Sequence, residues 1–174
     1  MERFDLYDPR RRPLGRTIAK GEDMPEGCRR LIVHVCVFNA KGELLIQQRQ
    51  PWKTNWANLW DVSVGGGVQA GETTQQAARR ELMEELGLDH DFEEESPVVS
   101  TTLLKGFDDF YIIHADSDLS TLKLQMEEVQ AVRWATREEV MALLTQGRFI
   151  PYSRPFLEYV FFRWNHPGNF DTGI

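Results

Sequence analysis

The sequence predicts one α/β domain in which helices pack on the faces of a mixed sheet. Its 174 residues are enough to bury a sizeable core, and 41% hydrophobic with 27% charged residues is an ordinary globular composition. Apolar, β-branched runs predict strands, most clearly over residues 31–38. Strand and helix patterns alternate without the regular spacing of βαβ units, which favours a mixed sheet.

The chain begins with a predicted β-hairpin. Phe4, Leu6 and Tyr7 carry its first strand, residues 8–13 form the turn, and residues 14–18 return. The turn contains three consecutive arginines, Arg10–Arg12. We expect them to form a solvated turn rather than a phosphate or partner contact.

Two strands follow a polar connection. Residues 31–38 predict a strand buried on both faces, and residues 43–48 return after a turn. His34 interrupts the first strand, and we expect a hydrogen-bonded core group rather than a ligand. Cys36 is expected to be a small core residue.

An irregular, tryptophan-rich segment covers residues 49–60. Trp60 precedes a strand and is expected in the core. Trp52 and Trp56 leave two interpretations open: they stack on a substrate group, or they plug the edge of the core.

A strand at residues 61–64 leads into three glycines and then the clearest helix of the chain. Thr73 and Gln76 predict a capping box at its start, and Gly87 predicts its end in a left-handed turn. Ala78, Leu82 and Leu86 mark its core face.

The remaining elements are read from shorter patterns. Residues 97–104 and 110–114 predict a strand pair joined by a turn at 105–109, and residues 129–134 predict a further strand. Thr136 and Glu139 predict a second capped helix that runs to about residue 145. A final helix is expected over residues 153–164, followed by a loose tail.

Three carboxylates lie on one edge of the helix after the glycines. At about 100° per residue, Glu81, Glu84 and Glu85 fall within an arc of roughly 100°. Like charges at this spacing destabilise a helix, so the cluster indicates a divalent cation, which prefers oxygen ligands. The alternative is a solvated acidic face with Arg79 and Arg80 as ion-pair partners.

The residues around this helix follow a longer pattern with fixed spacing. The pattern reads Gly66, five residues, Glu72, seven residues, Arg80-Glu81-Leu82, one residue, Glu84-Glu85, one residue, Gly87-Leu88. It resembles the Nudix box, the signature of the Nudix hydrolase superfamily, at every fixed position, and the resemblance covers about residues 30–147.

The resemblance implies a Nudix fold, an α/β/α sandwich around a mixed sheet, here with an N-terminal β-hairpin extension. We therefore expect a single Nudix domain over residues 1–174. It consists of the hairpin extension (1–29), the Nudix core (30–147) and a C-terminal helix with a tail (148–174). It implies a metal-dependent hydrolase that cleaves the diphosphate bond of a nucleoside diphosphate linked to another moiety. The expected cofactor is Mg²⁺, with Mn²⁺ as an alternative.

The same resemblance implies roles for single residues. Glu81, Glu84, Glu85 and the carbonyl of Gly65 become metal ligands, with Glu81 also a candidate general base. Arg80 is expected to pair with Glu72 and so to fix the glycine loop against the helix that follows it. Gly66, Glu72 and Gly87 are expected to have structural roles in the motif. A further acid often comes from outside the box in this family, and the candidates are Glu127 and Glu128, then Asp108 and Asp109. At all four positions an ordinary solvated loop acid is at least as well supported.

Two other functions are compared with this one. The early LYD–RRPLGRT hairpin, the FNAKGELLIQQR hairpin and SVGGGVQAGE also resemble isopentenyl-diphosphate isomerase and the hydrolases related to it. However, Gly65 stands at the isomerase's catalytic cysteine, Arg30 at a metal-binding histidine, and only Asp108 is acidic where the isomerase has a Glu-x-Glu pair. These departures disfavour the isomerase. A non-catalytic diphosphate-binding module is the third hypothesis, and it would not need the three helix glutamates together.

Composition limits the partners. The net charge of −7 argues against nucleic acid as the main partner, because a phosphate backbone calls for a basic surface. Two cysteines without CxxC or zinc spacing, no signal-peptide pattern and no apolar run approaching ~20 residues favour a cytoplasmic protein without a membrane partner. The diphosphate substrate itself, the number of metal ions and a homodimer are left open.

Overall fold

The computed structural model describes residues 1–166, in which a seven-stranded mixed sheet carries three helices. The central path of the sheet runs β5-β4-β3-β8-β7, with β6 paired to β3 and β9 to β4. In chain order the elements are β1 (Arg3–Tyr7), β2 (Pro13–Ala19), β3 (Arg30–Phe38), β4 (Leu44–Arg49), β5 (Trp60–Asp61), β6 (Val64–Gly67), α1 (Thr74–Leu86), β7 (Val99–Thr102), β8 (Gly106–His114), a 3-10 turn (Leu119–Thr121), β9 (Val129–Ala135), α2 (Arg137–Thr145) and α3 (Arg154–Arg163).

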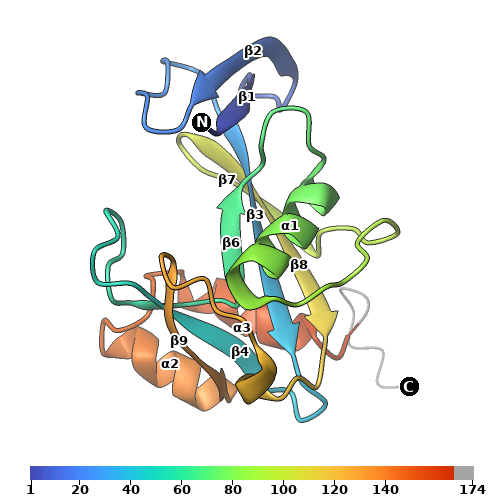
Figure 1. Ribbon diagram of the computed structural model, residues 1–174, viewed down its shortest axis with the longest axis vertical. Coiled ribbons are helices and arrows are strands. Elements are labelled where there is room, and N and C mark those ends of the chain that lie inside the picture. The colour runs from blue at the N-terminus through green and yellow to red at the C-terminus, as the bar shows by residue number, and fades with distance from the viewer. Residues whose placement is uncertain (167–174) are drawn as a thin grey trace.

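The central strand β3 separates two apolar clusters, because alternate side chains of a strand point to opposite faces. Val33 and Val35 pack with Leu82 of α1 on one face. Cys36 and Phe38 pack with residues of α2 and α3 on the other. Figure 1 shows α1 over one face of β3, with α2 and α3 toward the far end of the strand. The predicted α/β/α sandwich is therefore confirmed, and Cys36 is fully buried as expected.

Strand β8 corrects one sequence prediction. It pairs in parallel with β3 from Gly106 to His114, so residues 106–109 of the turn expected at 105–109 are strand. Asp108 and Asp109 are buried inside β8 and are not solvated loop acids. The acidic pair interrupts the apolar pattern, but its partners lie on other segments of the chain, where sequence spacing does not reveal them.

The N-terminal hairpin forms a separate two-stranded sheet with its own small cluster of Phe4, Leu6, Ile18 and Cys28. It lies at one end of β3 in Figure 1. The expectation of a solvated arginine turn is wrong for Arg11, whose guanidinium forms a two-pronged ion pair with buried Asp109. This contact fastens the hairpin to β8 across 98 positions of sequence.

The helix signals were accurate. Thr73 and Gln76 form the predicted capping box of α1, and Gly87 ends it with φ 68°. Thr136 and Glu139 form the predicted capping box of α2. The strand expected at 61–64 is two short pieces, β5 and β6. Part of the expected tail, residues 167–174, lies outside the described residues. No helix within residues 1–166 is long and apolar enough to cross a membrane.

Candidate active site

The loop after β6 and the helix α1 bring the predicted acidic residues to one edge of the sheet. The capping box fixes where α1 begins, and fully buried Ala78 and Leu82 fix which face turns inward. Glu81, Glu84 and Glu85 then follow the edge beside β6. Their burial increases toward the sheet, from Glu84, whose side chain is 49% exposed, to Glu85, which is 5% exposed.

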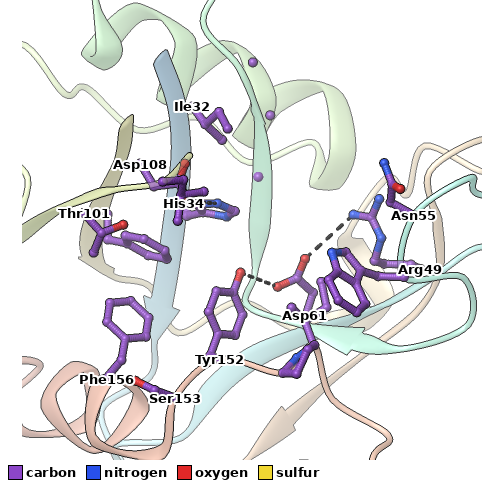
Figure 2. Close-up of a pocket in the computed structure, with 18 of the residues that line it drawn as sticks. Ile32, His34, Arg49, Asn55, Asp61, Thr101, Asp108, Tyr152, Ser153 and Phe156 are labelled. Carbon is purple, nitrogen blue, oxygen red and sulfur yellow. Dashed lines mark hydrogen bonds and ion pairs between the residues drawn. The ribbon is translucent and has the colours of Figure 1, made fainter. Parts of the chain in front are cut away.

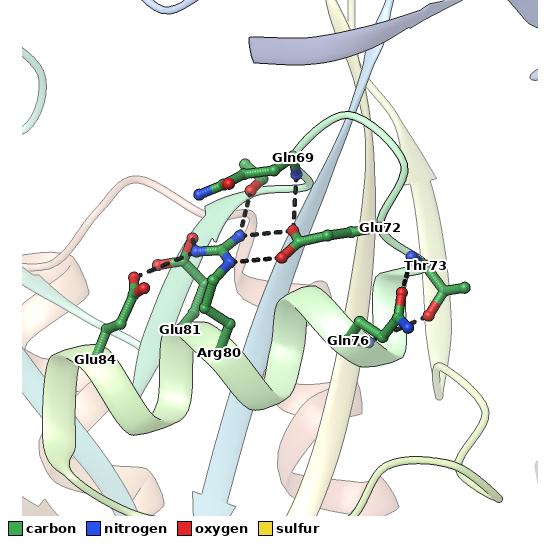
Figure 3. A network of polar contacts seen from close by, with 8 residues as sticks. Gln69, Glu72, Thr73, Gln76, Arg80, Glu81 and Glu84 are labelled. Carbon is green, nitrogen blue, oxygen red and sulfur yellow. Dashed lines mark hydrogen bonds and ion pairs between the residues drawn. The ribbon is translucent and has the colours of Figure 1, made fainter. Parts of the chain in front are cut away.

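Arg80 is the centre of a polar network that joins the loop to the helix (Figure 3). Its Nε and Nη2 donate to the two carboxylate oxygens of Glu72 at 2.7 and 2.9 Å. Nη2 also donates to the Gly67 carbonyl at 3.0 Å, and Nη1 to Glu81 at 2.7 Å and Glu84 at 3.3 Å. Burial raises the pKa of Glu72, but hydrogen bonds from Arg80 and the Gln69 N–H outweigh it and the pKa is lowered.

Gly66 makes room for the Glu81 carboxylate. A Cβ at position 66 would lie 2.1 Å from the Glu81 carboxylate carbon. The bare backbone of β6 therefore meets the acidic edge of α1 without an intervening side chain. Burial raises the pKa of Glu81, with Arg80 opposing the shift.

Glu85 is the most deeply placed carboxylate of the edge. Its Oε2 accepts a hydrogen bond from the Gln47 side-chain amide of β4 at 2.9 Å. No lysine or arginine among residues 1–166 lies within ion-pair distance of it. Burial and the neighbouring Glu81 charge raise its pKa well above the ordinary value. A buried carboxylate with a neutral partner and an anionic neighbour lacks compensating positive charge.

A pocket of about 590 Å³ adjoins this edge, lined by the three glycines of β6. Its polar wall contains a short chain of contacts: the Tyr152 hydroxyl donates to Asp61 at 3.0 Å, and Arg49 lies 3.7 Å from the same carboxylate. Figure 2 shows Tyr152 and His34 directed into this space. Complete burial raises the pKa of Asp61, despite the charges of His34 and Arg49.

Comparison with known proteins identifies the family. The NUDIX domain family model matches residues 29–160. The chain belongs to the Nudix hydrolase family. An uncharacterized Nudix hydrolase of Listeria monocytogenes is 47% identical over 152 residues, covering 87% of this chain and 90% of that protein. A crystal structure of a Deinococcus radiodurans protein matches with a TM-score of 0.73 and 29% identity, covering 95% of this chain and all of that one.

The Nudix box of this hydrolase does not hold a preformed metal cage. No three His, Cys, Asp or Glu side chains gather closely enough for one within residues 1–166. Arg80 engages Glu81 and Glu84 instead. The donor set nevertheless has the hard oxygen chemistry that magnesium prefers, and Glu85 has no cationic partner within residues 1–166. A bound cation would have to draw Glu81 and Glu84 away from Arg80.

The four acids expected outside the Nudix box differ in position. Glu128 forms an ion pair with Lys53, and its charge contributes to the raised pKa of Glu85. Glu127 is exposed. Asp108 lines the pocket, whereas Asp109 is held by Arg11. Of the four acids, Glu128 is thus the one whose charge acts on Glu85.

His34 contradicts the expectation of a hydrogen-bonded core group. Its ring stacks on Phe110 with centroids 4.5 Å apart, and Nε2 lies 3.6 Å from Asp108 Oδ2. Its buried Nδ1 and the buried Asp108 Oδ1 have no hydrogen-bond partner in the part of the chain that the structure describes. His34 therefore belongs to the pocket wall.

The three tryptophans of residues 49–60 differ in burial. Trp60 is buried as expected, while Trp52 and Trp56 are 67% and 51% exposed, so neither plugs the core. Trp56 lines the pocket. The pocket residues Asp61 and Tyr152 were missed by sequence reasoning. The one available signal in the sequence was Asp61, an acidic residue inside a strand, which could have indicated a functional role. Nothing in the sequence near Tyr152 distinguishes that residue.

One of the relatives carries the name of the isomerase. Isopentenyl-diphosphate Delta-isomerase 2 of Photorhabdus laumondii is 28% identical over 148 residues, covering 82% of this chain and 81% of that protein. At Gly65, where the resemblance to the isomerase would place a cysteine, a Cβ would lie 2.4 Å from His34 Nδ1. His34 thus fills the space that a side chain at position 65 would take.

Proposed function

We propose that this Nudix hydrolase cleaves the diphosphate bond of a nucleoside diphosphate linked to another moiety, with Mg²⁺ as cofactor and Mn²⁺ as an alternative. Nudix hydrolases generally use divalent metals and act on small molecules. The observation that carries the proposal is Glu85, a buried carboxylate without a cationic partner beside a second carboxylate. A divalent ion supplies the missing charge.

The ion would be held by Glu81, Glu84, Glu85 and the Gly65 carbonyl. When bound, such an ion neutralises phosphoryl oxygens and lowers the pKa of a water molecule. Glu128 is the candidate additional ligand or base, because its charge is felt at Glu85.

The protein residues have separate tasks in this proposal. Glu81 is the candidate general base: burial raises its pKa toward the range in which a carboxylate accepts a proton at neutral pH. Arg80 holds the Gly67 carbonyl and Glu72, so it fixes the loop relative to the helix. The bare glycines of β6 allow the diphosphate to approach the backbone.

The adjoining pocket is proposed to hold the moiety joined to the diphosphate. Trp56, Phe110 and Phe156 provide ring surfaces in its lining, which suits a nucleobase or another planar ring. Trp52 lies outside this lining, and its substrate-binding role stays a prediction. A cytoplasmic setting likewise stays a prediction from the sequence.

The proposal is tested by incubating the protein with diphosphate compounds and magnesium and measuring phosphate or pyrophosphate release. We expect Glu84→Gln and Glu85→Gln to remain folded and to lose turnover by about 10²-fold or more, in the range of a lost catalytic charge contact. Unchanged turnover in both variants would contradict the assignment.

A parallel incubation with isopentenyl diphosphate tests the alternative activity. Formation of the dimethylallyl isomer would establish isomerase chemistry, against which the blocked position 65 argues. Binding of diphosphates without any product would instead support the non-catalytic module.

A further inference from the structure

We propose that Arg30 forms an anion-binding site beside the Nudix glycines, which holds a phosphate group of the substrate from the side opposite the α1 glutamates. This inference rests on the proposed function, since it identifies how the same substrate is gripped at a second point.

Arg30 lies where the pocket meets the glycine strand. It is the first residue of β3, two positions before Ile32, which pairs with Gly67. Arg30 lines the main pocket and also a second, adjoining pocket of about 390 Å³ under the N-terminal hairpin. Its side chain therefore reaches the region between the hairpin and the bare backbone of β6.

Arg30 forms no ion pair with another residue in the part of the chain that the structure describes. The pocket lining contains two arginines, and Arg49 is paired with Asp61. No carboxylate lies within ion-pair distance of Arg30 in residues 1–166. Burial lowers its pKa, and Asp108 and Glu2 act in the opposite direction. An arginine stays protonated in spite of such a shift, so the pocket carries a half-buried, unpaired positive charge.

The N-terminal hairpin holds the Arg30 guanidinium in place. The guanidinium carbon of Arg30 lies over the ring of Phe4, 4.8 Å from the ring centroid. That ring is buried and also packs on Gly67, where a Cβ would lie 2.5 Å from it. The Ala70 N–H donates to the Arg3 carbonyl at 2.8 Å. Phe4 thus sets the position of Arg30 and of the glycine loop together.

A phosphate group fits this site better than a neutral group would. The planar guanidinium offers paired donors that match phosphate oxygens, and one of its faces is already covered by an aromatic ring. Because the side chain is held by Phe4, less conformational freedom is lost when it binds. The α1 glutamates are anionic and cannot provide this contact themselves, whereas Arg30 contacts an anion without a metal ion.

The test uses inorganic pyrophosphate as the probe, titrated calorimetrically into the full chain in EDTA so that no metal contributes. Loss of a hydrogen bond to a charged group predicts that Arg30→Met weakens binding about 10- to 100-fold. Arg30→Gln, which keeps a planar polar group without the charge, should show the same loss if the methionine variant folds poorly. Lys105→Met is the matched control: Lys105 is exposed and lines only the second pocket, so binding should stay within about twofold.

With a substrate identified by the release screen, Arg30→Met should raise KM more than it lowers kcat, because the contact is made in the bound ground state as well. A purely structural role would lower the melting temperature without changing pyrophosphate affinity at temperatures where the variant is folded. That result, or no metal-free binding of pyrophosphate by the unaltered protein, would overturn the inference. Because this assay requires no turnover, its failure is distinguishable from failure of the hydrolase assignment.

Discussion

Replacing Gly66 with alanine should damage catalysis while leaving the fold nearly unchanged. The new Cβ would lie 2.1 Å from the carboxylate carbon of Glu81, whereas ordinary contact begins at 3.4 Å, so the carboxylate must retreat by about 1.3 Å. A displacement near 1 Å at a reacting group can cost about 10²-fold in rate. We therefore expect Gly66→Ala to lower kcat by about 10²-fold.

The stability of this variant should change little, for two reasons. Gly66 does not have the positive φ that would strain an alanine. The atoms that must move are the far end of a flexible side chain, so the free energy of unfolding should change by about 1 kcal/mol or less. Turnover of a diphosphate substrate with magnesium and urea denaturation together measure both effects.

Gly106→Ala is the matched control for the extra methyl group. Its Cβ would meet Ile32 Cδ1 at 3.0 Å on the neighbouring strand and would not approach Glu81. We expect its turnover to stay within a few-fold of the unaltered protein. A Gly66→Ala variant as active as this control would show that turnover does not depend on the observed position of the Glu81 carboxylate.

Three further changes test the fold around the site. Burial raises the pKa of Glu85 above its ordinary 4.5, so its contribution to stability is present below that pH and is lost as pH rises through the raised value. Metal-free Glu85→Gln should therefore gain stability over the unaltered protein as pH increases, and equal melting temperatures from pH 4 to 8 would refute this. Arg11→Met removes the cation that pairs with Asp109, whose side chain is only 2% exposed. The free energy of unfolding, measured by urea denaturation, should fall by about 1–3 kcal/mol. An unchanged free energy of unfolding would show that other contacts hold the hairpin. Leu82→Ala empties a fully buried position and should cost about 2–5 kcal/mol by the same method, whereas a loss below about 1 kcal/mol would mean that the core under α1 collapses to fill the space.

The parts of the structure that the sequence predicted well depend on local signals. The start and end of α1 follow from Thr73, Gln76 and Gly87, which act within one turn of the helix. The acidic edge follows from helical spacing alone. Strand β3 follows from a continuous apolar run, which is typical of a strand covered on both faces.

The parts that were missed depend on contacts between distant segments. Asp109 looked like a turn residue because its partner, Arg11, comes 98 positions earlier. His34 looked like a core group because the space beside it exists only where β3, β6 and the segment around Tyr152 meet. In the sequence Arg30 stands out only as a departure from the isomerase pattern, since nothing there shows that Phe4 lies beneath it.

The glutamate edge of α1 should bind a divalent cation, and direct titration with Mn²⁺, followed by the electron paramagnetic resonance signal of the free ion, tests this without a known substrate. The unaltered protein should bind Mn²⁺, and Glu85→Gln should bind it at least about tenfold more weakly, because it removes the buried charge that lacks a cationic partner. Equal affinity in the two proteins would place the metal elsewhere and contradict the account.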